Sequence, residues 1–204
     1  MDLCRSYSPD CFSLDDILAS NANVSCKFLE ETKHLGFLDS SGQHEDVPAN
    51  AKLELPLWLA HLLNVTTYKQ IVSVSLPKLY RQTHRTMLDA GAEVVNLHSW
   101  GPHFYETGRH LLRLRHGEGP AIASTLVDTL RSRLRPIMDA SMNLTADDMT
   151  PVTATLDELE RTLFAAGQAS TRRHERWMRR ETAQITTDRN VMNYRKRKAA
   201  HMEA

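Results

Sequence analysis

The sequence of 204 residues has little cysteine, few glycines, no long apolar run and no net charge, and each shortage argues against a class of protein. Only three cysteines occur, Cys4, Cys11 and Cys26, and no short spacing pairs them, so we expect free thiols in a reducing compartment. No apolar run approaches the roughly 20 residues that a membrane span needs. The first residues lack a basic region followed by an apolar core, so no secretory signal is predicted.

The charges balance at 25 basic and 25 acidic residues, so the whole molecule lacks the electrostatic footprint of a nucleic-acid-binding protein. The balance is uneven along the chain, because acids outnumber bases in residues 1–75 and bases dominate after Arg161. The basic residues of the last third include Arg172, Arg173, Arg176, Arg179, Arg180, Arg195 and Lys198.

Motifs for catalysis or metal binding are also missing. The ten histidines form no HExxH pattern, and neither a paired CxxC nor a Cys/His zinc pattern occurs. The 8 glycines are dispersed and make no phosphate-binding loop. We interpret Asp157, Glu158 and Glu160 as a solvated helix face, since nothing apolar beside them would raise a pKa. The expectation is therefore a protein with no catalytic residues, no metal and no cofactor.

The first third of the chain predicts a small mixed α/β unit. Residues 13–18 predict a short helix with Ser13 as its cap, and residues 39–50 predict a loop. Pro56 suits the first turn of a helix that runs to Leu63. Alternating or β-branched patterns predict short strands at residues 24–30, 35–38, 51–55 and 71–74.

From Ser75 onward the apolar residues recur at helical spacing. One predicted helix ends at Gly91 and has the face Leu76, Leu79, Tyr80, Thr83 and Met87. Another is predicted over residues 103–114. A third begins at Pro120 and carries a stripe of Ile122, Leu126, Leu130, Leu134, Ile137 and Met138. Within it, Pro136 predicts a kink or a helix end.

The segment that follows Thr150 and Pro151 predicts a helix with an apolar seam that closes at Gly167. The seam consists of Val152, Leu156, Leu159, Leu163 and Ala166, in steps of four and three. A separate basic helix is predicted over residues 171–183, with weak order after residue 186. Such seams pack as a core or mark a protein interface, and at this stage both interpretations stay open.

The basic segment also has two interpretations. Its arginines, with Trp177 among them, could neutralise phosphates and stack on a base. However, Glu175 and Glu181 interrupt the positive charge, and arginine is equally favoured at protein interfaces. An acidic partner surface or a solvated helix is the favoured interpretation. Residues 195–198 could serve as a nuclear-localisation patch.

Several short motifs occur in a specific order along the chain. They are residues 13–18 (SLDDIL), 53–60 (LELPLWLA), 75–80 (SLPKLY), 101–105 (GPHFY), 137–139 (IMD), 156–160 (LDELE) with 163–164 (LF) and 167–168 (GQ), and 193–198 (NYRKRK). Taken together, this series resembles the third-subunit family of the GINS DNA replication complex. The resemblance spans nearly the whole chain.

The resemblance implies a mostly α, overall α+β fold. A small N-terminal β-containing B domain would occupy residues 1–74, a larger α-helical A domain residues 75–185, and a basic, weakly ordered tail residues 186–204. No catalytic residue can be carried over from this family. The residues that we select as candidates for the subunit interface are Leu156, Leu159, Leu163, Phe164, Phe104 and Tyr105.

The implied function is that of a non-catalytic scaffold subunit in a nuclear heterotetramer with three sister subunits. Through that complex the chain would join the MCM helicase ring and a RecJ-like partner in the eukaryotic replicative helicase, for both initiation and elongation of DNA replication. Contact with DNA would be indirect or weak, and contact with membranes absent. The alternative is a nucleic-acid-binding module that uses the basic helix at residues 172–180.

Overall fold

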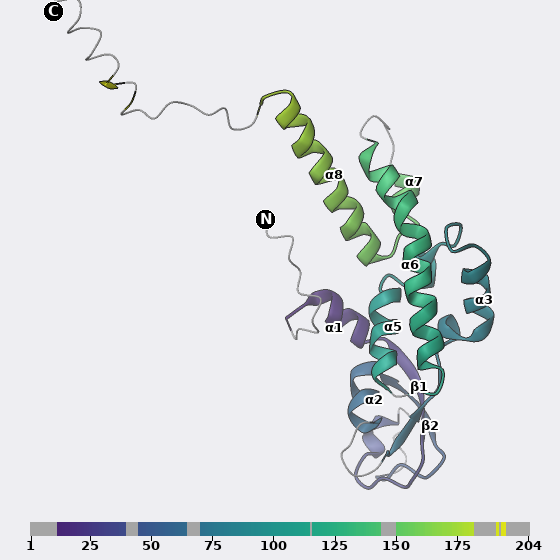
Figure 1. The fold of residues 1–204 in the computed structure, drawn as a ribbon. Coiled ribbons are helices and arrows are strands. Elements are labelled where there is room, and N and C mark those ends of the chain that lie inside the picture. Colours follow the sequence, from purple (N-terminus) through teal and green to yellow (C-terminus); the bar gives the residue numbers. More distant parts are fainter. Residues whose placement is uncertain are drawn as a thin grey trace, which may run out of the picture.

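The computed structural model describes residues 12–39, 45–64, 70–114, 116–143 and 150–181, together with residues 191, 193 and 194. Most described residues lie in α-helices, and a small sheet lies at the N-terminal end of the chain (Figure 1). This arrangement confirms the predicted mostly α, α+β fold. The predictions for Cys4, Cys11 and the basic residues 195–198 lie outside the described residues.

The sheet has three antiparallel strands in the order β2-β1-β3. They are β1 (Asn23–Phe28), β2 (Lys52–Pro56) and β3 (Val72–Val74). Alternation along β1 buries Val24, Cys26 and Phe28 on one face, as expected for a strand with one face in the core. Three of the four predicted strands are thereby confirmed.

Short helical elements surround the sheet. They are α1 (Leu14–Ser20), the 3₁₀ turn η1 (Gly36–Leu38) and α2 (Leu57–Asn64). The helix predicted after Ser13 is confirmed, although the Ser13 side chain makes no capping hydrogen bond. The strand predicted at residues 35–38 is wrong, because Leu38 N–H donates to the Leu35 carbonyl at 3.0 Å and closes a tight turn. A short apolar run does not distinguish these two conformations.

The helical part packs around one long helix. Its elements are η2 (Lys78–Tyr80), α3 (Gln82–Gly91), α4 (Leu97–Trp100), α5 (Phe104–Arg113), α6 (Gly119–Met142), α7 (Thr150–Thr153) and α8 (Glu158–Met178). α6 contacts α3, α5 and α8, and α8 extends away from the rest of the molecule (Figure 1). No described helix combines the length and the hydropathy that a membrane span requires.

Two details of these helices differ from the sequence-based expectation. Of the predicted apolar face, Leu76, Leu79 and Tyr80 do pack in or against the core. α3, however, begins only at Gln82 and buries Leu88, whereas Met87 is 51% exposed, so the part of that face on α3 is wrong by one position. α6 continues through Pro136 to Met142, so the proline does not end the helix. Pro136 lies on the exposed side, where water can bind the carbonyl group that loses its helical hydrogen bond.

The main hydrophobic core is continuous from the sheet into the helices. Its buried members include Phe28, Leu55, Leu57, Val72, Leu97, Phe104, Leu111 and Ile122. A smaller apolar cluster of Ile137, Leu156 and Phe164 lies between α6 and α8. The two clusters leave between them a region in which charged side chains are buried, and the base of α8 is located there.

Candidate subunit interface and the polar cluster beneath it

A capping box starts α8, formed by the N-cap residue Asp157 and by Glu160 at the third position of the helix. Asp157 Oδ2 accepts a hydrogen bond from Leu159 N–H at 3.1 Å, and Glu160 Oε2 accepts one from Asp157 N–H at 3.2 Å. The second oxygen of Asp157, Oδ1, accepts from Phe104 N–H at 2.7 Å. One buried carboxylate therefore caps both α8 and the first residue of α5.

Arg133, near the middle of α6, is buried with all of its N–H groups bonded. Its Nε donates to Glu160 Oε1 at 2.7 Å, and its Nη2 donates to Glu160 Oε2 at 2.9 Å, which makes a bidentate ion pair. The remaining N–H groups donate to main-chain carbonyls at Ala92 (2.8 Å), Val95 (2.7 Å) and Thr155 (3.3 Å). A guanidinium has five N–H donors, and here five acceptors meet them.

Tyr105 completes this group, which we call the polar cluster (Tyr105, Arg133, Asp157 and Glu160). The Tyr105 hydroxyl donates to Glu160 Oε1 at 2.8 Å and so ties α5 to α8. Burial raises the pKa of the Tyr105 hydroxyl, and the charge of Glu160 raises it further. The hydroxyl is therefore a permanent donor at physiological pH.

Burial has a different effect on each charged member of the polar cluster. It raises the pKa of the Asp157 carboxyl to about 7, against the opposing pull of two backbone N–H donors. It lowers the pKa of the Arg133 guanidinium, but the hydrogen bonds and charge of Glu160 more than offset this, so the net pKa is raised. Arg133 thus stays charged, while Asp157 titrates near neutral pH.

The interpretation of Asp157, Glu158 and Glu160 as a solvated helix face is wrong. Asp157 and Glu160 are both 0% exposed, and only Glu158 is partly exposed. The basic partner of Glu160, Arg133, lies on α6, 27 residues upstream, so local patterning did not show it. The available signal was the Asp-x-x-Glu spacing before an apolar run, which is typical of a capping box.

Above the polar cluster, α8 lies close against α6 at Gly167. A Cβ atom at this position would lie 2.3 Å from Ser141 Oγ and 2.9 Å from Ser141 Cβ. Gly167 therefore allows close packing and does not end the helix, so the predicted end at this residue is wrong. The predicted continuous seam is also wrong, because the helix is interrupted before Asp157. The separately predicted basic helix is the second half of α8.

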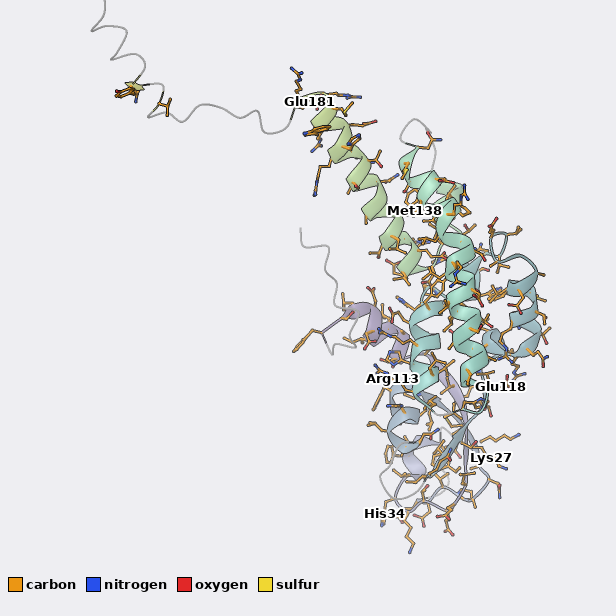
Figure 2. The ribbon with its side chains drawn as sticks, in the orientation of Figure 1. Lys27, His34, Arg113, Glu118, Met138 and Glu181 are labelled. Carbon is orange, nitrogen blue, oxygen red and sulfur yellow. The ribbon has the colours of Figure 1, made fainter. Side chains whose placement is uncertain are left out.

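The far half of α8, residues 168–178, extends beyond its contact with α6. At 1.5 Å per residue this half is about 17 Å long. Figure 2 shows this half of α8 diverging from α6 towards Glu181, just past its end, and most of its side chains are exposed. Trp177 and Met178 are each 64% exposed. A helix of this length has little stability of its own, and large apolar side chains on it favour a partner.

A second exposed apolar surface runs along α6. We call it the α6 stripe, and it consists of Val127, Leu134, Met138 and Met142, which are 57%, 37%, 47% and 57% exposed. The spacings of seven, four and four residues place the four side chains on one side of the helix. Figure 2 labels Met138 on the part of α6 next to the diverging half of α8. An exposed apolar stripe of this kind marks a protein interface.

The structure places the six interface candidates in two groups. Four of them, Phe104, Tyr105, Leu156 and Phe164, are 2–7% exposed and pack within this chain. Those four offer no free surface to a partner as they lie here. Leu159 and Leu163 are half-buried on α8, so their assignment to the interface stays a prediction. The α6 stripe extends the predicted face of that helix to Val127 and Met142, which the sequence analysis missed.

Exposed apolar side chains also lie on α1, which packs beside α5 (Figure 1). Asp16 Oδ1 holds α1 against α5, because Arg109 Nη2 lies 3.1 Å and His110 Nε2 2.8 Å from it. With α1 held in this orientation, Leu14 and Leu18 remain 74% and 58% exposed. This surface is a third candidate for protein contact.

The remaining reactive groups have structural surroundings. Cys26 is buried in the sheet, and burial raises the pKa of its thiol to about 11, as expected for an inert structural cysteine. Among the described residues, no group of three or more His, Cys, Asp and Glu side chains is arranged to hold a metal ion.

In comparisons with known proteins, the N-terminal part and the helical part of the chain each match a protein-family model. Residues 12–65 match the family model described as the PSF3 N-terminal domain. Residues 79–179 match the model described as the GINS complex protein helical bundle domain, so the part of the chain that carries the polar cluster and α8 is a GINS-type helical bundle.

Full-length relatives give the more specific assignment. The chain is 43% identical over 192 residues to the DNA replication complex GINS protein PSF3 of Xenopus laevis, with 94% of this chain and 91% of that protein covered. It is 42% identical over 196 residues to the human protein of the same name, with 94% and 90% covered. The chain therefore belongs to the PSF3 family of DNA replication complex GINS proteins.

Proposed function

We propose that this chain is a non-catalytic scaffold subunit of a nuclear, heterotetrameric GINS complex, and that its helical bundle binds three sister subunits. The far half of α8 is the observation that carries this proposal. It is a stretch of about three turns in which most side chains, Trp177 and Met178 included, are exposed, so folding of the chain alone leaves it largely uncovered.

We assign the contact to two surfaces, the far half of α8 and the α6 stripe. Both are exposed, both carry large apolar side chains, and both belong to helices that the Arg133–Glu160 ion pair joins. Leu159 and Leu163 extend the apolar side of α8 towards that base and are included as candidates. Aromatic residues, methionine and arginine are the residues that protein interfaces favour, and α8 carries all three.

The wider assembly follows from membership of the family and is part of the same proposal. As a GINS subunit, the chain would join the MCM helicase ring and the RecJ-like helicase partner through the complex, in initiation and elongation of DNA replication. Its contact with DNA would be indirect or weak. We retain the division into a B domain at residues 1–74, an A domain at residues 75–185 and a basic tail from residue 186 as a proposal.

Single aspartate substitutions test the assigned surfaces. In cells that co-express the three sister subunits, Met138→Asp and Trp177→Asp should each reduce recovery of this chain with its sisters by at least tenfold. A matched control is Val94→Asp, because Val94 is 90% exposed and lies on neither surface. Equal recovery of Met138→Asp, Trp177→Asp and the control would reject both surfaces.

A second candidate function is that of a nucleic-acid-binding module at residues 172–180. One observation on α8 favours it. Arg172, Arg173 and Arg176 are exposed, and the His174 and Trp177 rings stack with centroids 5.8 Å apart. Binding through these groups would weaken steeply with added salt. Fluorescence anisotropy with single-stranded and duplex DNA at two salt concentrations separates the two functions. Absence of measurable binding by this chain removes the second one.

A further inference from the structure

Within the described residues, the contacts that hold α8 against the rest of the chain lie between Asp157 and Gly167. We propose that the polar cluster is a positioning element, which sets the direction in which α8 leaves the bundle and thereby its fit to a sister subunit. This inference rests on the proposed scaffold function. It adds an assignment for Arg133 and Glu160, which touch no partner themselves and act through α8.

The hydrogen bonds of Arg133 connect four separate parts of the fold. From α6, its side chain reaches the turn after α3 at Ala92 and Val95, the loop before α8 at Thr155, and α8 itself at Glu160. The Tyr105 hydroxyl adds α5 through the same carboxylate. Because every N–H of the guanidinium already has an acceptor, a rotation of α8 at this point would break several bonds together.

Asp157 fixes the start of the helix in the same way. Its two carboxylate oxygens accept from N–H groups of α5 and α8, and Glu158 N–H donates to the Pro102 carbonyl at 2.9 Å. The close approach of Gly167 to Ser141 supplies a second point of contact about ten residues further along. These contacts define the axis of α8 within its first three turns.

Geometry amplifies any error at this base. Trp177 lies about 28 Å along the helix from Glu158, so a tilt of roughly 10° at the base would displace it by about 5 Å. A displacement of this size moves a side chain out of a matching pocket on a partner. Most side chains in the far half of α8 are exposed, so little in the described part of the chain would correct this displacement.

Stability alone does not explain a buried ion pair at this place. Replacement of a buried ion pair by apolar side chains of similar volume is often neutral or stabilising, whereas removal of one partner is strongly destabilising. Apolar side chains would fill the same volume but would accept several orientations of α8. A bidentate ion pair whose other hydrogen-bond acceptors are fixed allows only one orientation of α8. We therefore assign to the polar cluster the role of fixing the orientation of α8.

The double variant Arg133→Met/Glu160→Met distinguishes an effect on the orientation of α8 from an effect on the stability of the fold. Tagged variant and wild-type chains should be co-expressed with a limiting amount of the three sister subunits, and the ratio of the two chains in the purified complex measured. We expect incorporation of the double variant to fall at least tenfold, while its melting temperature by circular dichroism stays within a few degrees of wild type. The matched control is Val72→Ala, which weakens the buried sheet far from α8 and should incorporate normally below its melting temperature.

A distance measurement in the chain alone provides a readout that a purely structural role would not change. Spin labels at Val127→Cys and Met178→Cys, in an N-terminal solubility fusion with Cys4 and Cys11 replaced by serine, report the α6–α8 geometry. Cys26 can remain, because it is buried and inert. The double variant should give a broader or shifted distance distribution than the wild type. Tyr105→Phe, which removes only one hydrogen bond, should give a smaller change in the same direction.

Unchanged label distances together with wild-type incorporation of the double variant would overturn the positioning role. If the double variant does not fold, Tyr105→Phe decides the matter, since an unchanged distance distribution in that variant also overturns it. Failure of the wild-type chain to join any sister subunit would instead reject the proposed scaffold function, and the label distances would still report on the polar cluster.

Discussion

At the sheet end of the molecule, Phe28 and Val72 are buried among other apolar side chains, whereas at the helical end Arg133 and Glu160 are buried against each other. An apolar core tolerates small adjustments, because its attractions have no direction. A bidentate ion pair does not, because each bond needs one geometry. The ion pair thus lies at the start of α8, whose direction matters for the proposed contact with a sister subunit. The sheet end requires only close packing.

The largest effect should come from removal of one charge at the helical end. Glu160→Ala leaves Arg133 buried without its counter-charge, and the free energy of unfolding should fall by about 3–5 kcal/mol. Urea unfolding measures this. Glu158→Ala is the control, because Glu158 is partly exposed and its carboxylate lies 3.7 Å from Arg161, so the loss should stay below about 1 kcal/mol. Similar losses in both variants would contradict a special role for the buried pair.

A truncation at the sheet end should cost slightly less and have a different consequence. Leu55→Ala removes a buried side chain from the apolar core, and the free energy of unfolding should fall by about 3 kcal/mol. Because α8 is untouched, recovery with the sister subunits below the melting temperature should match wild type. A loss of assembly in this variant would remove the distinction between the two ends.

The two ends should also differ in their response to pH. The pKa of Asp157 is about 7 in the folded chain and about 4 in the unfolded chain, so the fold favours the protonated carboxyl. Its contribution to stability is therefore complete below about pH 4 and is lost as the pH rises to 7, at up to about 1.4 kcal/mol per pH unit. Urea unfolding across this range should show the slope in wild type and in Leu55→Ala.

Asp157→Asn should remove this slope. The amide cannot titrate, and its NH₂ group cannot accept from a helix N–H, so a loss of about 1–3 kcal/mol is also expected. A wild-type curve that rises over the same pH range, or one parallel to that of Asp157→Asn, would show that the carboxyl stays ionised in the folded chain.

The smallest effect on the fold should occur at the far end of α8. Trp177→Ala removes a side chain that is 64% exposed, so the free energy of unfolding should change by less than about 0.5 kcal/mol. Recovery with the sister subunits should nevertheless fall severalfold, because large apolar side chains dominate interface energies. A variant that is destabilised yet assembles normally would mean that Trp177 packs within its own chain.

How much of this structure was predictable also differs between the two ends. At the sheet end, the alternation of Val24, Cys26 and Phe28 and the β-branched residues 71–74 predicted strands that the structure confirms. These signals are local, since a strand buries every second residue whatever its partner is. The exception is residues 35–38, which are too few for periodicity to decide.

At the helical end, the helices were predictable but their buried polar contacts were not. The apolar spacing placed α5 and α6 correctly, but Arg133 was not selected at all and Asp157 and Glu160 were assigned to solvent. Whether a charge is buried depends on a partner that arrives from elsewhere in the sequence, and that information is not local. Gly167 was misinterpreted for the same reason, because its role depends on Ser141 in another helix.

The central claim is that the exposed half of α8 and the α6 stripe are completed by sister subunits. The most direct test is co-expression of this chain with the three sisters, followed by size-exclusion chromatography with light scattering. The account predicts one species whose mass corresponds to one copy of each subunit, and a chain that is poorly soluble when expressed alone. A stable, monodisperse monomer of this chain, eluting apart from the sisters, would contradict it.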